Sequence, residues 1–156
     1  TKIPLIWVDI HSGYGPKDQM SIINSQFEID VTNEMIQTYD YPLILGINDN
    51  DIYDTDGDII EKFYEIRNSK YKKFELYATT LEFGTNGIGS VKSIESLKAL
   101  MARNHVRYIK ENSNLESYSI KLMKKQFAPK NEKWRKKADE DFLHAITTIL
   151  KYKKLV

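Results

Sequence analysis

The sequence predicts a layered α/β domain. Short apolar, β-branched runs near residues 5–10, 20–24 and 73–83 alternate with longer segments of helical periodicity. A last helical segment carries apolar residues at steps of three and four, a stripe of the kind that packs on a sheet. With 156 residues, 41% of them hydrophobic and 29% charged, the chain is long enough for one globular domain, which we expect to span residues 1–156.

The first half of the chain predicts two strands, one helix and a further short apolar run. Residues 5–10 are almost continuously apolar, which is typical of a central strand covered on both faces. Glycine, serine and proline at residues 12–16 predict a loop. We expect a short strand at 20–24, a short helix near 30–40 and a further short apolar run at 43–47.

The second half predicts a long strand among helices. The acidic loop at 49–58 ends in Gly57 and Asp58, which can cap a helix through residue 67. This loop does not fit a calcium-binding EF-hand, because Ile52 and Phe63 would take its first and twelfth positions. Residues 73–83 predict a long strand, which includes Phe74, Leu76, Ala78, Leu81 and Phe83 and is followed by a Gly/Asn/Ser loop.

Three helices complete the predicted fold. They cover residues 93–112, residues 116–127 before Pro129, and a last segment whose apolar stripe comprises Trp134, Ala138, Phe142, Ala145 and Ile149.

Composition and charge limit the function classes. The chain has no cysteine, which excludes disulfides and thiolate sites; we favour a cytoplasmic location. No apolar run has the roughly 18 residues of a membrane span, and we expect no membrane partner. Residues 1–99 have a net charge of −7 and residues 100–156 a net charge of +8. We interpret the basic segment 121–137 as a solvated face rather than a nucleic-acid surface, which would show steep salt dependence.

Two predicted strands end in a chemically capable side chain. His11 follows the first strand and precedes "SGYG", and Glu82 lies near the end of the long strand before "FGTNG". Ligands of α/β sheets gather beyond the carboxyl ends of strands. A neutral imidazole that binds zinc and a carboxylate that acts as general base are the parts of a metal hydrolase. Each residue alone is also compatible with a structural role.

Three motifs together are more specific. "WVDIHSGYGP", "IYDTDGDIIE" and "LYATTLEFGT" resemble the carboxyl-terminal half of the M14-like zinc carboxypeptidase superfamily, and most closely its DUF2817 branch. The resemblance implies a layered α/β/α domain with a mixed, largely parallel sheet that lacks its amino-terminal half. It also implies that His11 is a zinc ligand, that Glu82 is the general base and, more loosely, that Tyr53 is a loop tyrosine that closes over the substrate.

Other parts of the family pattern are missing. No H-x-x-E motif occurs, so two zinc ligands are not found, and no substrate-binding arginine motif is recognisable. We interpret Arg103 and Arg107 as surface or ion-pairing residues and His105 and His144 as packing or capping residues. Asp141 and His144 stand three residues apart, but their turn is predicted to face the core, so we do not expect a metal site there.

These observations support one main hypothesis with alternatives. One zinc ligand and one base do not complete a zinc site, and the chain enters its first strand abruptly after Thr1. We expect the carboxyl-terminal portion of a zinc-dependent hydrolase that acts on a peptide or peptide-like amide. An N-acyl amino acid deacylase is a close variant, and a non-catalytic α/β module is the alternative. The exposed edge of the strand at 5–10 also predicts pairing between two copies of the chain.

Overall fold

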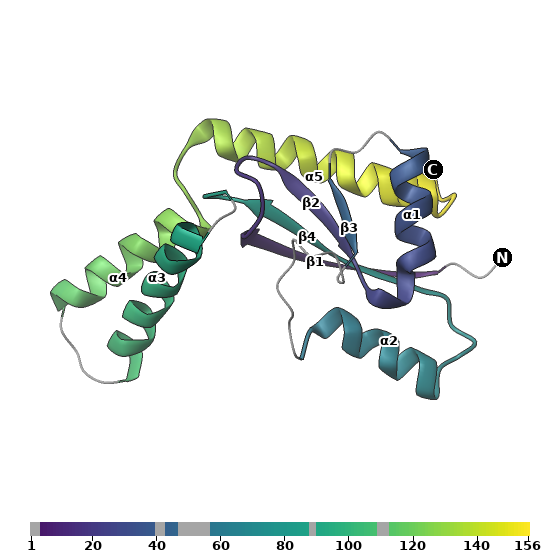
Figure 1. Ribbon diagram of the computed structural model, residues 1–156, viewed down its shortest axis with the longest axis horizontal. Coiled ribbons are helices and arrows are strands. Elements are labelled where there is room, and N and C mark those ends of the chain that lie inside the picture. The colour runs from purple at the N-terminus through teal and green to yellow at the C-terminus, as the bar shows by residue number, and fades with distance from the viewer. Residues whose placement is uncertain (1–3, 40–42, 47–56, 88–89, 109–112) are drawn as a thin grey trace. The chain divides into compact units, whose positions relative to one another are not determined.

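A four-stranded sheet with helices on both faces forms the fold. The computed structural model describes residues 4–39, 43–46, 57–87, 90–108 and 113–156 (Figure 1). The chain divides into two compact units, the first made of residues 1–11, 21–82 and 142–156, and the second of residues 12–20 and 83–141. Several helices and strands contribute residues to both units.

The strands are β1 (Leu5–Gly13), β2 (Met20–Asn24), β3 (Ile44–Gly46) and β4 (Leu76–Gly84), in the spatial order β1-β4-β2-β3. β1 runs parallel to β4, because the Leu5 N–H donates to Glu75 O near one end and the Thr85 N–H donates to Gly13 O near the other. β2 and β3 are also parallel. β4 runs antiparallel to β2, because the Gly84 N–H donates to Gln19 O and the Thr79 hydroxyl donates to Ile23 O. The sheet is therefore mixed and largely parallel, as predicted.

The helices are α1 (Ile29–Thr38), α2 (Ile59–Lys70), α3 (Ser90–Tyr108), α4 (Ser113–Phe127) and α5 (Glu132–Tyr152), with a 3-10 turn at Gln26–Glu28. Asp58 caps α2 as predicted, because its side chain accepts hydrogen bonds from the N–H groups of Ile60 and Glu61. α4 ends two residues before Pro129. None of the helices in the described ranges has the length and hydropathy of a membrane-spanning segment.

In the first unit, helices cover both faces of the sheet. On one face, Ile60 and Tyr64 of α2 form a buried cluster with Leu76 and Ala78 of β4. On the other face, the ammonium group of Lys153, just beyond α5, lies 4.7 Å from the ring centre of Tyr77. Ala145 and Ile149 of the predicted α5 stripe are buried as well. The predicted α/β/α layering is therefore confirmed.

The expected position of β1 in the sheet is wrong. Among the described strands, β1 pairs with β4 alone and lies at the edge, and Leu5 and Ile10 are 59% and 58% exposed. β4 is instead the strand that is buried on both faces. The apolar run at 5–10 favoured a strand but could not show what covers it. The expected pairing of two copies through this edge stays a prediction. Phe74 also departs from expectation, since it precedes β4 and is 67% exposed.

A buried polar contact connects α2 to the sheet and to the turn before α1. The Tyr64 hydroxyl donates to Oε1 of Glu28 at 2.9 Å and accepts the N–H of Ala78 at 2.8 Å. Burial raises the pKa of Tyr64, so the phenol stays protonated and can donate. Burial also raises the pKa of Glu28. Both side chains are thus buried, and each is a hydrogen-bond partner of the other.

Replacing Tyr64 by phenylalanine should destabilise the chain by about 1–3 kcal/mol, because the buried Glu28 carboxyl and the Ala78 N–H both lose their partner. Tyr71→Phe is the matched control, since Tyr71 is 53% exposed. Urea unfolding followed by circular dichroism measures the difference. Equal midpoints for the two variants would contradict the prediction.

Glu28→Gln should change how stability depends on pH. A carboxyl whose pKa is raised on folding stabilises the folded state fully below its ordinary value of 4.5, and this contribution is lost as the pH rises through the folded value. The wild-type chain should therefore lose stability relative to Glu28→Gln as the pH rises from 4.5 toward neutrality. Urea unfolding across this range tests it, with the exposed Glu65→Gln as control; parallel curves for wild type and Glu28→Gln would argue against the assignment.

Candidate active site

The two site residues predicted at strand ends lie next to each other. His11 is on β1 and Glu82 is on the neighbouring strand β4, and both strands run in the same direction. Nδ1 of His11 lies 3.6 Å from Oε2 of Glu82. The parallel pairing therefore brings together the imidazole and the carboxylate that lie 71 positions apart in the sequence.

The two side chains differ in their access to solvent. The Glu82 side chain is 7% exposed, whereas the His11 side chain is 49% exposed. A buried carboxylate beside an accessible imidazole can act on a molecule that approaches from the solvent side. The imidazole is the group that such a molecule or an ion reaches first.

A third polar residue, Asp9, belongs to this site. Its Oδ2 lies 3.0 Å from Nε2 of His11. Residues two apart on a strand point to the same face, so the D-x-H spacing alone could have identified this contact. Asp9 lies within the motif "WVDIHSGYGP", but sequence reasoning had assigned it no role.

The described part of the chain supplies some of the donors of a metal site. Imidazole and carboxylate are ordinary zinc ligands, and the exposed imidazole of His11 suits that role. However, no group of three histidine or acidic side chains among the described residues is placed to hold a metal ion. Tyr53, the third predicted site residue, lies outside the described residues, as does most of the acidic loop before α2.

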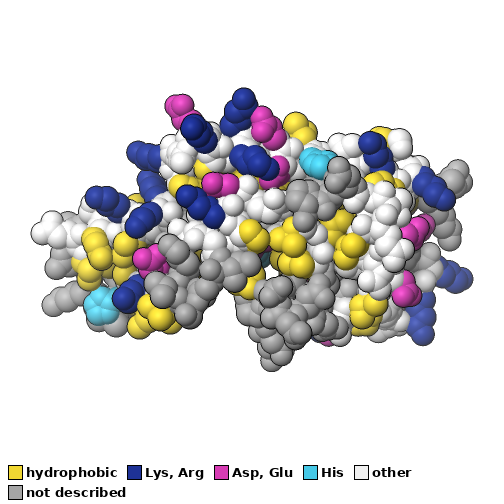
Figure 2. Space-filling model, turned by 45° about the horizontal axis from the view of Figure 1, so that its top comes forward, with side chains coloured by type: hydrophobic (Ala, Val, Ile, Leu, Met, Phe, Trp, Pro, Cys, Tyr) yellow, Lys and Arg dark blue, Asp and Glu magenta, His cyan; other side chains and the backbone are white. Residues whose placement is uncertain are grey.

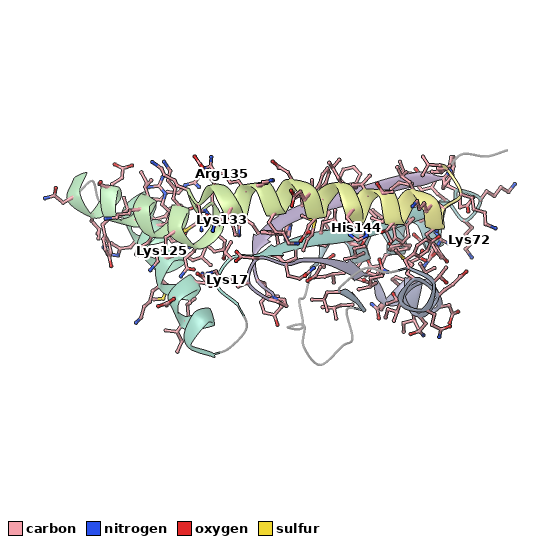
Figure 3. All side chains as sticks on the ribbon, turned by 90° about the horizontal axis from the view of Figure 1, so that it is seen from above. Lys17, Lys72, Lys125, Lys133, Arg135 and His144 are labelled. Carbon is pink, nitrogen blue, oxygen red and sulfur yellow. The ribbon has the colours of Figure 1, made fainter. Side chains whose placement is uncertain are left out.

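The other polar candidates lie on helices α3 and α5. Arg103 pairs with Glu116 at 3.6 Å across the α3–α4 hairpin, which confirms its ion-pairing role. His105 on α3 and His144 on α5 (labelled in Figure 3) are exposed, which argues against the packing part of their expected role, and His105 lies in the last turn of α3, where a capping role remains a prediction. In the second unit, the Asp141 carboxylate accepts the Met20 N–H and pairs with Lys137.

Two lysines of the basic segment at 121–137 pair with acidic side chains on α5. Lys136 pairs with Glu140 and Lys137 with Asp141, each one turn along α5. Figure 2 shows acidic side chains among the lysine and arginine side chains on the face in view. This mixture favours the interpretation as a solvated, ion-paired face.

In the second unit, the loop after β1 contacts the end of β4 at Gly84. The Gly84 N–H donates to Gln19 O, and Gly84 O accepts the Asp18 N–H. A Cβ atom at Gly84 would lie 1.9 Å from Pro16 O. Gly15 has a φ of 94°, a conformation that favours glycine. The glycines that follow the two site residues in sequence thus permit a close backbone approach.

The end of α4 is tied to the same two loops. The hydroxyl of Ser12 donates to Phe127 O, and the hydroxyl of Thr85 donates to Gln126 O. These bonds satisfy carbonyl groups that the last turn of a helix leaves without partners. In the same unit, Trp134 packs on Phe83 with ring centres 5.1 Å apart and donates to Gly84 O.

Comparison with known proteins gives a match to a protein family. A family model described as "Protein of unknown function (DUF2817)" matches residues 2–140. No curated protein and no solved structure shows significant similarity to the chain. The match covers the candidate site residues on β1 and β4.

Gly84→Ala should destabilise the chain by about 3 kcal/mol, because the added methyl group would collide with backbone atoms of Pro16 and cannot be relieved by a side-chain rotation. Gly57→Ala is the comparison: a Cβ there meets no atom within 4 Å, and only the strain of its φ of 85°, about 1–2 kcal/mol, remains. Urea unfolding measures both. A smaller loss of stability for Gly84→Ala than for Gly57→Ala would refute the close approach of Gly84 to Pro16.

Proposed function

The chain belongs to the DUF2817 family, and we propose that it supplies part of the active site of a zinc-dependent hydrolase that cleaves an amide bond in a peptide or peptide-like substrate. The observation that carries this proposal is the 3.6 Å contact between the accessible imidazole of His11 and the buried carboxylate of Glu82. The resemblance of the flanking motifs to M14-like zinc carboxypeptidases supports the choice of metal and of reaction.

His11 and Glu82 have different roles in this proposal. His11 provides a ring nitrogen as a zinc ligand. Glu82 accepts the proton of the attacking water and returns it to the leaving amine. When bound, zinc polarises the substrate carbonyl and lowers the pKa of the water. Because the Glu82 side chain is buried, few water molecules compete for its carboxylate. The carboxylate can therefore accept a proton from the attacking water beside His11.

Catalytic zinc usually has three protein ligands and one open position. The described residues offer one imidazole in a suitable position, so the remaining ligands are a further part of the proposal. Tyr53 is proposed to close over bound substrate. An N-acyl amino acid deacylase uses the same chemistry and differs only in the substrate that it accepts.

The alternative is a non-catalytic α/β module. It is favoured by the finding that no three-donor group occurs among the described residues. The two proposals differ in whether zinc binding depends on His11, which an affinity measurement decides.

His11→Ala should weaken zinc binding by roughly 100-fold or more, because it removes a ligand rather than a supporting group. Glu82→Gln should keep zinc affinity within a few-fold but lower hydrolysis by about 10²–10⁴-fold. Isothermal titration calorimetry with zinc, in this chain and in any longer natural form, gives the affinities. Assays on N-acyl amino acids and on peptides with a free carboxyl terminus give the rates.

His105→Ala is the matched control, since His105 is an exposed histidine on α3. It should leave both measurements unchanged. Equal zinc affinity of wild type and His11→Ala would refute the zinc proposal. An absence of zinc binding in every form would favour the non-catalytic module.

A further inference from the structure

We propose that α3 is a dimerisation helix, whose exposed apolar stripe packs against the same stripe of a second copy of the chain as a short parallel coiled coil. The stripe consists of Ile94, Leu97, Met101 and Tyr108. The dimer depends neither on the proposed hydrolase activity nor on a metal. It also differs from pairing through the edge of β1, because α3 belongs to the second unit.

The two sides of α3 have different surroundings. α3 and α4 lie side by side (Figure 1), and Ala99 and Val106 of α3 are buried. These two residues point away from Met101, because each residue turns the helix by about 100°. The four side chains of the stripe are instead 50–75% exposed. α3 thus has a buried side and, opposite to it, an apolar side that is exposed to solvent.

The spacing of the stripe is that of a coiled-coil seam. Positions 94, 97, 101, 104 and 108 follow steps of three and four, which are the a and d positions of consecutive heptads. Such a stripe is narrower than the apolar face of a helix that packs in a globular core. Asn104 takes one seam position and is exposed as well. A single polar residue in a seam can fix the register of two helices. The pattern therefore indicates a helix as the occupant.

Symmetry and charge favour a second copy of this chain as that helix. In a parallel pair related by a twofold axis, like residues meet, so each stripe is covered by an identical one. Lys98 takes an e position and would face Ser93 of the other copy. Arg107 takes a g position and has no e position opposite it, because α3 ends at Tyr108. Like charges therefore do not meet.

The size of the stripe fits a weak dimer. Pairing would cover on the order of 400 Å² of apolar surface on each copy, about half of the ~800 Å² per partner in an interface of standard size. Exposed apolar patches of this size on a monomer are often functional. The dimer should therefore form in a concentration-dependent way and dissociate on dilution.

The first experiment measures association of the whole chain by sedimentation velocity from about 5 to 500 µM, the range of a weak complex. Wild type should change from monomer to dimer as the concentration rises. Leu97→Lys should raise the dissociation constant at least about 10-fold, because an ammonium group would enter the apolar seam. Leu143→Lys is the matched control, since Leu143 is an exposed leucine on α5, and it should associate like wild type. Both variants change exposed positions and should keep the urea midpoint of wild type.

The second experiment tests the direction of the helices. The chain has no cysteine, so one introduced cysteine can form a disulfide only with a second copy. Ile94→Cys, oxidised with glutathione disulfide, should give a cross-linked dimer, because parallel pairing brings the two Cα atoms to about 4.4–6.8 Å. In an antiparallel pair centred on Met101 they would be about 20 Å apart. Leu143→Cys is the control and should stay without a cross-link.

The outcomes decide the inference without reference to zinc. Wild type that stays monomeric at the highest concentration overturns it. A dimer that persists unchanged in Leu97→Lys also overturns it, because the copies then pair through another surface, such as the edge of β1. A dimer of Ile94→Cys that forms no cross-link overturns the parallel arrangement. Dimerisation of wild type, its weakening by Leu97→Lys but not by Leu143→Lys, and the cross-link at residue 94 together support it.

Discussion

The parallel pairing of β1 with β4 is the constraint on which the candidate site depends. β1 carries Asp9 and His11, β4 carries Glu82, and hydrogen bonds hold the strands together near both ends. β4 is buried on both faces, so it is the fixed member of the pair. A slip of one residue would turn Glu82 to the opposite face of the sheet and separate it from His11. The register, more than any single side chain, creates the site.

The sequence predicted local structure well where a local physical cause exists. Asp58 at the start of α2 and Pro129 after α4 mark helix ends through hydrogen bonding and backbone geometry that depend on few neighbours. The predicted central position of β1 in the sheet was wrong, because an apolar run does not reveal which elements cover it. Asp9 was overlooked although its spacing from His11 is a local signal. The contact of Tyr64 with Glu28 joins residues 36 positions apart and has no such signal.

The glycines near the site show a second limit of prediction from the sequence. The glycines after His11 predicted a loop from the sequence, and the φ of 94° at Gly15 agrees with a turn there. At Gly84 the structure gives another reason, which is the contact of backbone with Pro16. The sequence identifies small residues, but the partner that requires their small size comes from a different segment. Sequence reasoning therefore predicts the site chemistry more readily than the packing around it.

The edge position of β1 has a consequence for how the site could be completed. A strand added on the side of β1 where none of the described strands pairs would lie about 4.8 Å from it, and every second side chain of that strand would point to the face of Asp9 and His11. One such strand would satisfy the open backbone groups of β1 and also bring new side chains beside the imidazole. Closure of the sheet edge and assembly of the donor set would then be the same event.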